Sequence, residues 1–530
     1  MELLPAQRDT RLFYQRALLD ERIVRKHDAL IIVCERAHAA GLIAQLPFAA
    51  TWRRLYDEAR RRGAVTSINA RLTDAATSIV IAFVKADASA FDRLTLAARA
   101  WKELNAPARA RVLLGTLGLD AKESDAVLES LIAAALAATA AMPTLKSKAQ
   151  TSSEPTSFTL LHEGKRPDFA RSVAVDRGNH LARWLTTLPP NVLDTAGYRR
   201  ALRDLARRER WEFSFLDEAA LKRRKAGAFL AVSRANEHRN AGIVRLRYRS
   251  ANRRKTPIRL ALVGKGICFD TGGVNLKTHK GMYHMHEDMQ GSAVAVGTLL
   301  ALSALAAPCD IDCWLAITEN QIGARAYRPQ EVVRASNGVT IQVAHSDAEG
   351  RMVLADTLAI AARETPDLMI DFATLTGSCV VALGDRYSAA FTNRPEWRQA
   401  LELAGRDSGE RVWPFPMDED YDAELESSIA DVLQCTPDSK ADHILAARFL
   451  NRFVPAEIPW IHLDLAASNR SGGLAHIPTD FTGFGVRYAT QLLLDHDLLR
   501  ERPARQTGKL DADKRADRLT RLTGKPARGR

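Results

Sequence analysis

The sequence predicts an α/β protein made of two α/β domains. Apolar runs of strand length alternate with amphipathic or small-residue segments of helix length along most of the chain. Several of the strand-like runs are almost continuously apolar, which is typical of buried parallel strands. The length of 530 residues also exceeds what one hydrophobic core usually serves, so more than one domain is expected.

The first domain is predicted to cover residues 1–165 as an N-terminal α/β unit. Strands are expected at 29–34, 78–84, 111–117 and 157–162, and helices at 50–62 and 92–104. A long Ala-rich helix is predicted to begin with Ser124 as its N-cap and to end at Pro143. The polar Ser/Thr/Pro-rich stretch at about 143–156 reads as a linker.

The second domain, residues 166–500, is predicted to hold a mixed, mostly parallel central sheet with helices on both faces. Strands are expected at 211–216, 229–232, 243–248, 258–263, 311–317, 368–372 and 460–465. Helices are expected at 168–187, 218–226 and 288–305. Functional sites in such sheets lie beyond the carboxyl ends of the strands, and Lys265, Thr374 and Asp464 sit at or just past such ends.

Composition indicates a protein of the cytoplasm. The chain has 46% hydrophobic and 26% charged residues, as ordinary globular proteins do, and no apolar run reaches the length of about 18 residues that a membrane span needs. The first residues lack the basic and apolar pattern of a signal peptide. Most of the six cysteines lie in apolar segments, which fits reduced, buried thiols better than disulfides.

The net charge of +12 is concentrated at the C-terminus. Residues 501–530 contain ten Lys/Arg and four Asp/Glu, so they supply +6 of it. This Pro/Gly-punctuated segment is predicted to be a disordered tail. A solubilising extension is the preferred interpretation, and a DNA-binding or architectural role through the basic surface and tail is the alternative.

Charged residues gather between Leu262 and Arg351 in apolar and Gly-rich surroundings. Four acids and three cations are involved: Asp270, Asp288, Asp347, Glu349, Lys265, Lys277 and Arg351. Taken singly, Asp288 could be a helix N-cap, and Asp347 with Glu349 a charged turn before a helix from about Met352. Together, buried carboxylates are costly unless positive charge compensates them, and a pair of divalent ions bridged by carboxylates fits this spacing.

Other catalytic patterns are missing from the same stretch. The Lys of Gly264-Lys265-Gly266 precedes the Gly272-Gly273 pair, so no P-loop pattern is present. No His pair has the spacing of a zinc-binding HExxH helix, and no GxSxG motif marks a serine nucleophile. The sequence therefore favours a carboxylate-rich site for two metal ions.

Several motifs resemble the leucine (cytosol) aminopeptidase family of dinuclear metallopeptidases. They extend over about residues 188–494 and do not include the first domain. They are Gly264-Lys265-Gly266 with Phe269-Asp270, Lys277 and Asp288-Met289, then Asp347-Ala348-Glu349-Gly350-Arg351, Ala373 to Gly377, His462-Leu463-Asp464, and Thr482 to Arg487. His345-Ser346 stands where the family signature has Asn-Thr.

The resemblance implies a role for each matching residue. One metal ion would be bound by Lys265, Asp270, Asp288 and Glu349, and a more exchangeable one by Asp270, Asp347 and Glu349. Lys277 would stabilise the oxyanion, and Arg351 would hold a bicarbonate-type base. Substrate would contact Met285, Thr374, Leu375, Gly377 and Ala466.

The resemblance also implies partners and cofactors. Peptides with a free N-terminus would be the substrates, two divalent ions per subunit (Mn²⁺ or Zn²⁺) the cofactors, and a homohexamer the assembly. Two departures put the leucine preference in question: Asn469 in place of a small or apolar pocket residue, and Thr436 to His443 in place of a more Gly-rich stretch. A two-metal phosphoesterase is the competing enzymatic interpretation.

Overall fold

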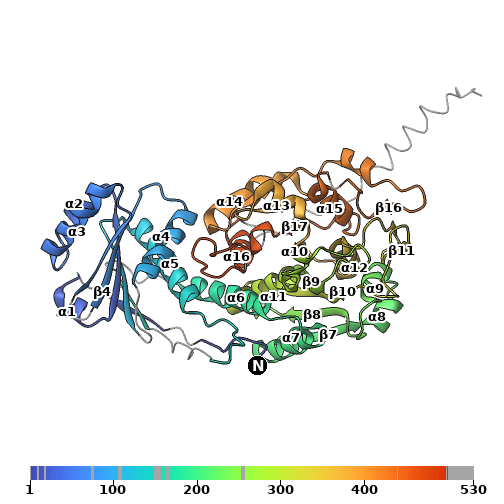
Figure 1. The fold of residues 1–530 in the computed structure, drawn as a ribbon, viewed down its shortest axis with the longest axis horizontal. Coiled ribbons are helices and arrows are strands. Elements are labelled where there is room, and N and C mark those ends of the chain that lie inside the picture. The colour runs from blue at the N-terminus through green and yellow to red at the C-terminus, as the bar shows by residue number, and fades with distance from the viewer. Residues whose placement is uncertain are drawn as a thin grey trace, which may run out of the picture.

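The computed structural model has two lobes, each built around its own sheet (Figure 1). It describes residues 2–498 apart from 9–10, 17–18, 73–76, 105–109, 149–156, 163–167, 252–256, 439 and 497. The predicted tail at 501–530 and part of the predicted linker lie outside the described residues. The predicted two-domain α/β class is confirmed.

The N-terminal lobe is a six-stranded sheet between two helical layers. Its strand order is β1 (Leu12–Gln15), β6 (Ser157–Leu161), β5 (Arg111–Leu117), β2 (Ala29–Glu35), β4 (Thr77–Val84) and β3 (Ser67–Leu72). Only the β3–β4 pairing among these strands is antiparallel. Helices α4 (Ala90–Leu104) and α5 (Ala121–Thr139) pack on one face, and α1 (Glu21–Arg25), α2 (Ala39–Ile43) and α3 (Ala49–Arg62) on the other.

The larger lobe holds an eight-stranded mixed sheet. Its order is β15 (Val412–Pro414), β14 (Ser388–Thr392), β17 (Trp460–Asp464), β13 (Leu368–Ala373), β9 (Ile258–Asp270), β10 (Cys309–Asn320), β8 (Gly242–Tyr248) and β7 (Glu212–Asp217). The four central strands β17, β13, β9 and β10 are mutually parallel. The predicted sheet type is therefore confirmed.

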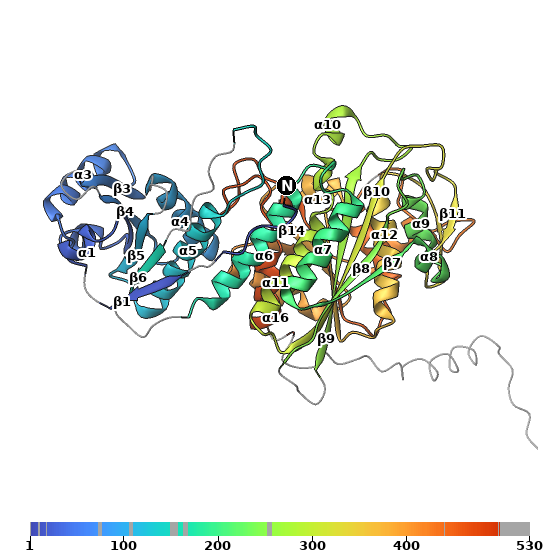
Figure 2. The same ribbon diagram turned by 90° about the horizontal axis from the view of Figure 1, so that it is seen from below.

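Strand β9 shows how this sheet is buried on both faces (Figure 2). Leu260 and Leu262 pack with α6 (Ala170–Thr187), α7 (Thr195–Glu209), α11 (Gln290–Ala304) and α16 (Val486–Asp495). Ala261 and Val263 face α9 (Gly227–Ser233), α12 (Glu349–Ala362) and α15 (Asp442–Asn451). Alternate side chains of one strand thus join two separate cores, which explains its continuous apolar run. In the described part of the chain, no helix is long and apolar enough to cross a membrane.

Three local predictions are wrong. Residues 229–232 were predicted to be a strand but form part of helix α9. They are apolar because this helix is buried against α12, and a short apolar run does not distinguish a buried strand from a buried helix. Helix α5 begins at Ala121, because the Asp120 carboxylate accepts a hydrogen bond from the Glu123 amide (2.9 Å), and Ser124 is not its cap. Helix α12 begins at Glu349, before the predicted start near Met352.

Candidate active site

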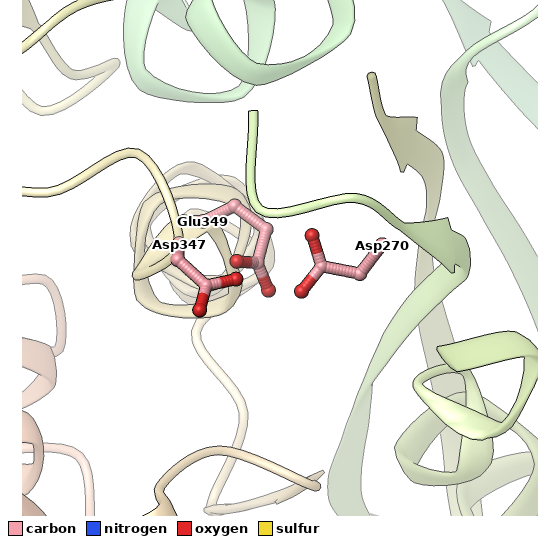
Figure 3. Close-up of side chains that lie close together, drawn as sticks. All are labelled: Asp270, Asp347 and Glu349. Carbon is pink, nitrogen blue, oxygen red and sulfur yellow. The ribbon is translucent and has the colours of Figure 1, made fainter. Parts of the chain in front are cut away.

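Three of the four acids of the predicted cluster meet at the carboxyl edge of the larger sheet (Figure 3). Asp270 ends β9, Asp347 lies in the turn before α12, and Glu349 is the first residue of α12. Carboxylate oxygens of these three residues lie within 4.8 Å of one another. Their side chains come from segments about 80 residues apart in the chain, which the parallel sheet brings to one point.

Lys265 lies in the middle of β9, and its side chain contacts the acids of the cluster. Its Nζ atom is 2.8 Å from Asp288 Oδ1, 3.0 Å from Glu349 Oε1 and 2.9 Å from the Thr374 carbonyl oxygen. A Cβ atom at Gly350 would come within 2.7 Å of the lysine amine, so glycine makes room for it. Burial alone would lower the pKa of Lys265, but the neighbouring carboxylates outweigh it and raise that pKa above its ordinary value.

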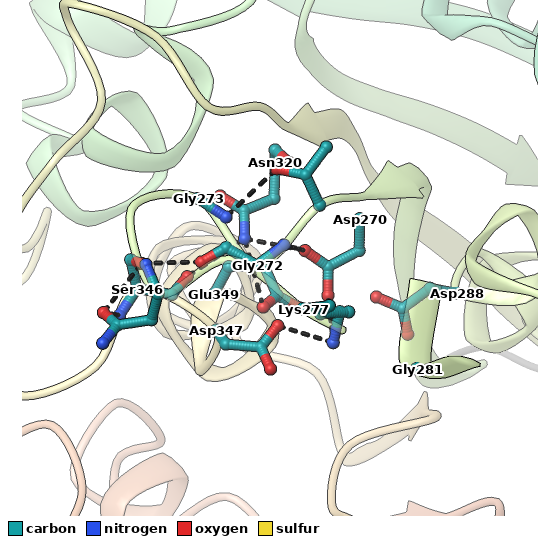
Figure 4. Close-up of polar contacts among 12 residues, drawn as sticks. Asp270, Gly272, Gly273, Lys277, Gly281, Asp288, Asn320, Ser346, Asp347 and Glu349 are labelled. Carbon is teal, nitrogen blue, oxygen red and sulfur yellow. Dashed lines mark hydrogen bonds and ion pairs between the residues drawn. The ribbon is translucent and has the colours of Figure 1, made fainter. Parts of the chain in front are cut away.

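Lys277 approaches from the loop after β9 (Figure 4). Its Nζ atom lies 2.9 Å from Asp270 Oδ2 and 2.5 Å from Asp347 Oδ1. Gly272 and Gly273 have φ values of 86° and 67°, a backbone conformation that glycine adopts without strain, and so turn the chain back toward the strand. Burial opposes the charge of Lys277, yet the surrounding carboxylates raise its pKa, so it is an ammonium at neutral pH.

Asn320 belongs to the site although the sequence motifs do not include it. It ends β10 beside β9, is buried, and its amide nitrogen donates to Asp270 Oδ1 (2.8 Å) and to the Ser346 carbonyl oxygen (3.0 Å). The same nitrogen lies 3.5 Å from Glu349 Oε2. A polar residue at the end of a buried strand next to β9 was the signal that could have identified it.

The cluster has the charge and the free oxygen atoms that metal ions require. Four carboxylates face two lysines, and Asp288 Oδ2 is buried with no hydrogen-bond partner among the described residues. Burial holds the pKa of Asp288 well above its usual range. A buried carboxylate oxygen without a donor is costly unless a cation faces it, so these residues fit divalent ions with oxygen ligands.

A cavity of about 420 Å³ opens over the cluster. All twelve predicted site residues line it, including those predicted to contact substrate, which are Met285, Thr374, Leu375, Gly377 and Ala466. Asp464, at the end of β17, fixes one wall by accepting hydrogen bonds from the Leu375 amide (3.0 Å) and the Thr376 hydroxyl (2.6 Å). The residues predicted from the sequence therefore surround this cavity. The structure adds that Asp464 holds Leu375 and Thr376 in place by hydrogen bonds.

A polar pair lies in the same cavity, at the position where the family resemblance implies a small or apolar residue. The Asn469 amide donates to Glu287 Oε2 at 2.7 Å, and both residues line the cavity. Burial raises the pKa of Glu287 to about 7. Asn469 thus lines the cavity, whereas no described residue of 436–443 does.

The surroundings of Arg351 differ from the predicted ones. Its Nη2 atom donates to both carboxylate oxygens of Asp442 at 2.8 Å, and Nη1 donates to the Gln434 carbonyl oxygen at 3.2 Å. A carboxylate of the chain thus pairs with the buried guanidinium where a bicarbonate was predicted, and the Nε atom of Arg351 has no hydrogen-bond partner among the described residues.

The fold and the cluster define a class: two-lobed α/β proteins with a carboxylate- and lysine-rich site at the carboxyl edge of the larger sheet. The model of the cytosol aminopeptidase family, catalytic domain, matches residues 180–490, and the chain belongs to this family. A probable cytosol aminopeptidase of Wolbachia pipientis is 41% identical over 317 residues, which are 59% of this chain and 63% of the relative. One from Syntrophotalea carbinolica is 40% identical over 329 residues, 61% of this chain and 65% of the relative. The chain thus matches less than two thirds of the length of these curated relatives.

Solved structures share the two-lobed fold over most of the chain. A tomato leucine aminopeptidase mutant superposes with a TM-score of 0.79 at 25% identity, covering 93% of this chain and 98% of that one. The bottromycin maturation enzyme BotP in complex with Mn gives a TM-score of 0.74 at 28% identity, covering 88% of this chain and 98% of that one. The similarity includes the N-terminal lobe, which the sequence motifs left out.

Proposed function

We propose that this chain is a metal-dependent aminopeptidase that removes the N-terminal residue from peptides. The observation that carries the proposal is the convergence of four carboxylates and two lysines at one end of the sheet, where Asp288 Oδ2 has no donor within the described part of the chain. Membership in the cytosol aminopeptidase family and the names of the relatives support this reaction.

The proposal assigns two ions to the cluster. Lys265, Asp270, Asp288 and Glu349 would hold one of them, and Asp270, Asp347 and Glu349 the other, so that Asp270 and Glu349 bridge. Lys265 would bind as a neutral amine, because adjacent dications depress the pKa of a lysine. Bound ions of this kind acidify water and polarise a carbonyl group. Mn²⁺ and Zn²⁺ are the ions we expect, and the relative BotP was solved with Mn.

The protein's own groups would orient the peptide and stabilise developing charge. The Lys277 ammonium lines the cavity and would stabilise the negative charge that develops on the peptide carbonyl oxygen. Backbone groups of Leu375 and Gly377 would hold the substrate backbone. Met285 and Ala466 would contact the N-terminal side chain, and a free α-amine is the feature that we expect the site to require.

The proposal also includes an assembly and a compartment. We expect a homohexamer in the cytoplasm, which light scattering and fractionation would test. The six cysteines agree with reducing surroundings, since all of them are buried and free. The alternative role in DNA binding depends mainly on the tail at 501–530, outside the described residues, and a gel shift with and without that tail would test it.

The decisive test is metal-dependent release of N-terminal residues. Metal-free protein, reloaded with Mn²⁺ or Zn²⁺, should hydrolyse Leu, Ala, Met or Arg dipeptides but not their N-acetylated forms, and an arylphosphate should stay intact. Glu349→Ala should remove activity and weaken metal binding, because it deletes a bridging ligand. Folded protein that releases no residue with any metal would contradict the proposal.

A further inference from the structure

Arg351 is a buried cation of the active-site cavity whose counter-charge comes from elsewhere in the fold. It is only 2% exposed, lies two residues after Glu349 in α12 and lines the cavity. Both oxygens of the Asp442 carboxylate accept from its Nη2 atom at 2.8 Å.

Asp442 is held in place by its helix. It is the first residue of the ten-residue helix α15, where the helix dipole favours a negative charge. The next residue anchors this end of α15, since the His443 amide donates to the Ser378 hydroxyl at 2.8 Å and its ring packs edge-on against Phe415 at 4.6 Å. The carboxylate is therefore fixed by two positive partners, the arginine and the helix N-terminus.

The segment that leads to Asp442 is also tied to the turn that carries the ligands. The Gln434 side chain accepts from the Ala344 and His345 amides at 3.0 Å and donates to the Ala348 carbonyl oxygen at 3.0 Å. Its own carbonyl oxygen accepts from Arg351. Gln434 and Asp442 thus both contact Arg351, one through its backbone carbonyl and the other through its carboxylate.

We propose that Asp442 is the resident anion of Arg351, and that this chain therefore acts without bicarbonate or another exchangeable anion at that arginine. The inference rests on the proposed aminopeptidase function. Asp442 takes Nη2 of the guanidinium and the Gln434 carbonyl oxygen takes Nη1, so a second anion would find only the Nε nitrogen without a partner among the described residues. Asp442 is a positioning residue, because it acts through Arg351.

Anion dependence tests the proposal. We would measure peptide turnover of the wild type, Asp442→Ala and Asp438→Ala in bicarbonate-free buffer and with increasing bicarbonate or formate. Asp438 is an exposed acid four residues upstream and serves as the matched control. The wild type and the control should not respond to either anion. Asp442→Ala should lose about 10–100-fold in kcat and regain part of it saturably as anion is added.

A thermal shift gives a readout that does not need turnover. Bicarbonate or formate should raise the Tm of Asp442→Ala, which has an open anion site, and leave the wild type unchanged. If Asp442→Ala does not fold, Asp442→Asn replaces it, and the wild-type titration still decides.

Three results would overturn the proposal: stimulation of the wild type by bicarbonate, an Asp442→Ala variant as active as the wild type and indifferent to anions, or equal thermal shifts in both. If neither the wild type nor either variant cleaves peptides, the proposed aminopeptidase function is wrong. The thermal shifts would then still test whether Asp442 is the resident anion of Arg351.

Discussion

Replacing Asn320 with Ala would test whether the carboxylate cluster depends on a residue outside the family motifs. The Asn320 amide donates to Asp270 Oδ1 at 2.8 Å and lies 3.5 Å from Glu349 Oε2, and these are the two acids proposed to bridge the ions. A hydrogen bond to a charged acceptor contributes about 1.5–3 kcal/mol. Losing it should weaken metal binding about 10–100-fold, as removal of groups that orient metal ligands usually does.

The assay is calorimetric titration of metal-free protein with Mn²⁺. Asn337→Ala is the matched control, because that amide donates to the Arg452 carbonyl oxygen (3.2 Å) in an exposed position. The control should bind metal as the wild type does. If Asn320→Ala is folded by circular dichroism and binds Mn²⁺ with unchanged affinity, the Asn320 amide does not hold the ligands and the argument fails.

Three further predictions concern polar groups, two of them in the cavity and one, Glu410, buried against the start of α16. Lys277→Ala should lower kcat about 10²–10³-fold, because the oxyanion loses the cation that stabilises it. Steady-state kinetics together with metal analysis would check this, and an unchanged kcat would show that Lys277 does not stabilise the oxyanion. Burial raises the pKa of Glu410 to about 7, so its ionisation opposes folding and its contribution to stability falls as pH rises from about 4.5 to 7. Glu410→Gln should lack this loss, and Tm values at pH 5 and pH 8 would show a smaller decrease than in the wild type. Asn469→Met removes the donor to Glu287 and should raise kcat/KM for N-terminal Leu relative to N-terminal Gln about tenfold. An unchanged ratio would show that Asn469 does not determine which N-terminal residue is preferred.

Much of the site could be predicted because its residues follow strands and turns that are continuous in sequence. The apolar run of β9 places Lys265 and Asp270 at the sheet edge, and the glycines after it return Lys277 to the same point. Asp347 and Glu349 precede the body of a helix that packs on that strand. These features lie close together in the sequence, so the order of apolar, glycine and charged residues is enough to identify them.

Contacts between distant segments could not be predicted in this way. Asn320 lies 50 residues from Asp270, and only the pairing of β10 with β9 places them together. Residues 229–232 have the apolar character of a strand, but whether a short buried run becomes a strand or a helix depends on its neighbours in space.

Arg351 illustrates why a matching motif does not fix the role of each of its residues. The sequence places this arginine beside Glu349, and the resemblance gives it an exchangeable anion. Asp442 lies 91 residues away in a stretch that departs from the family pattern, and the departure alone did not indicate what the new residues contact. In the fold, the changed stretch supplies the negative charge that a buried guanidinium requires. The role of an active-site cation therefore follows from the location of its counter-charge, which belongs to the tertiary structure rather than to the motif.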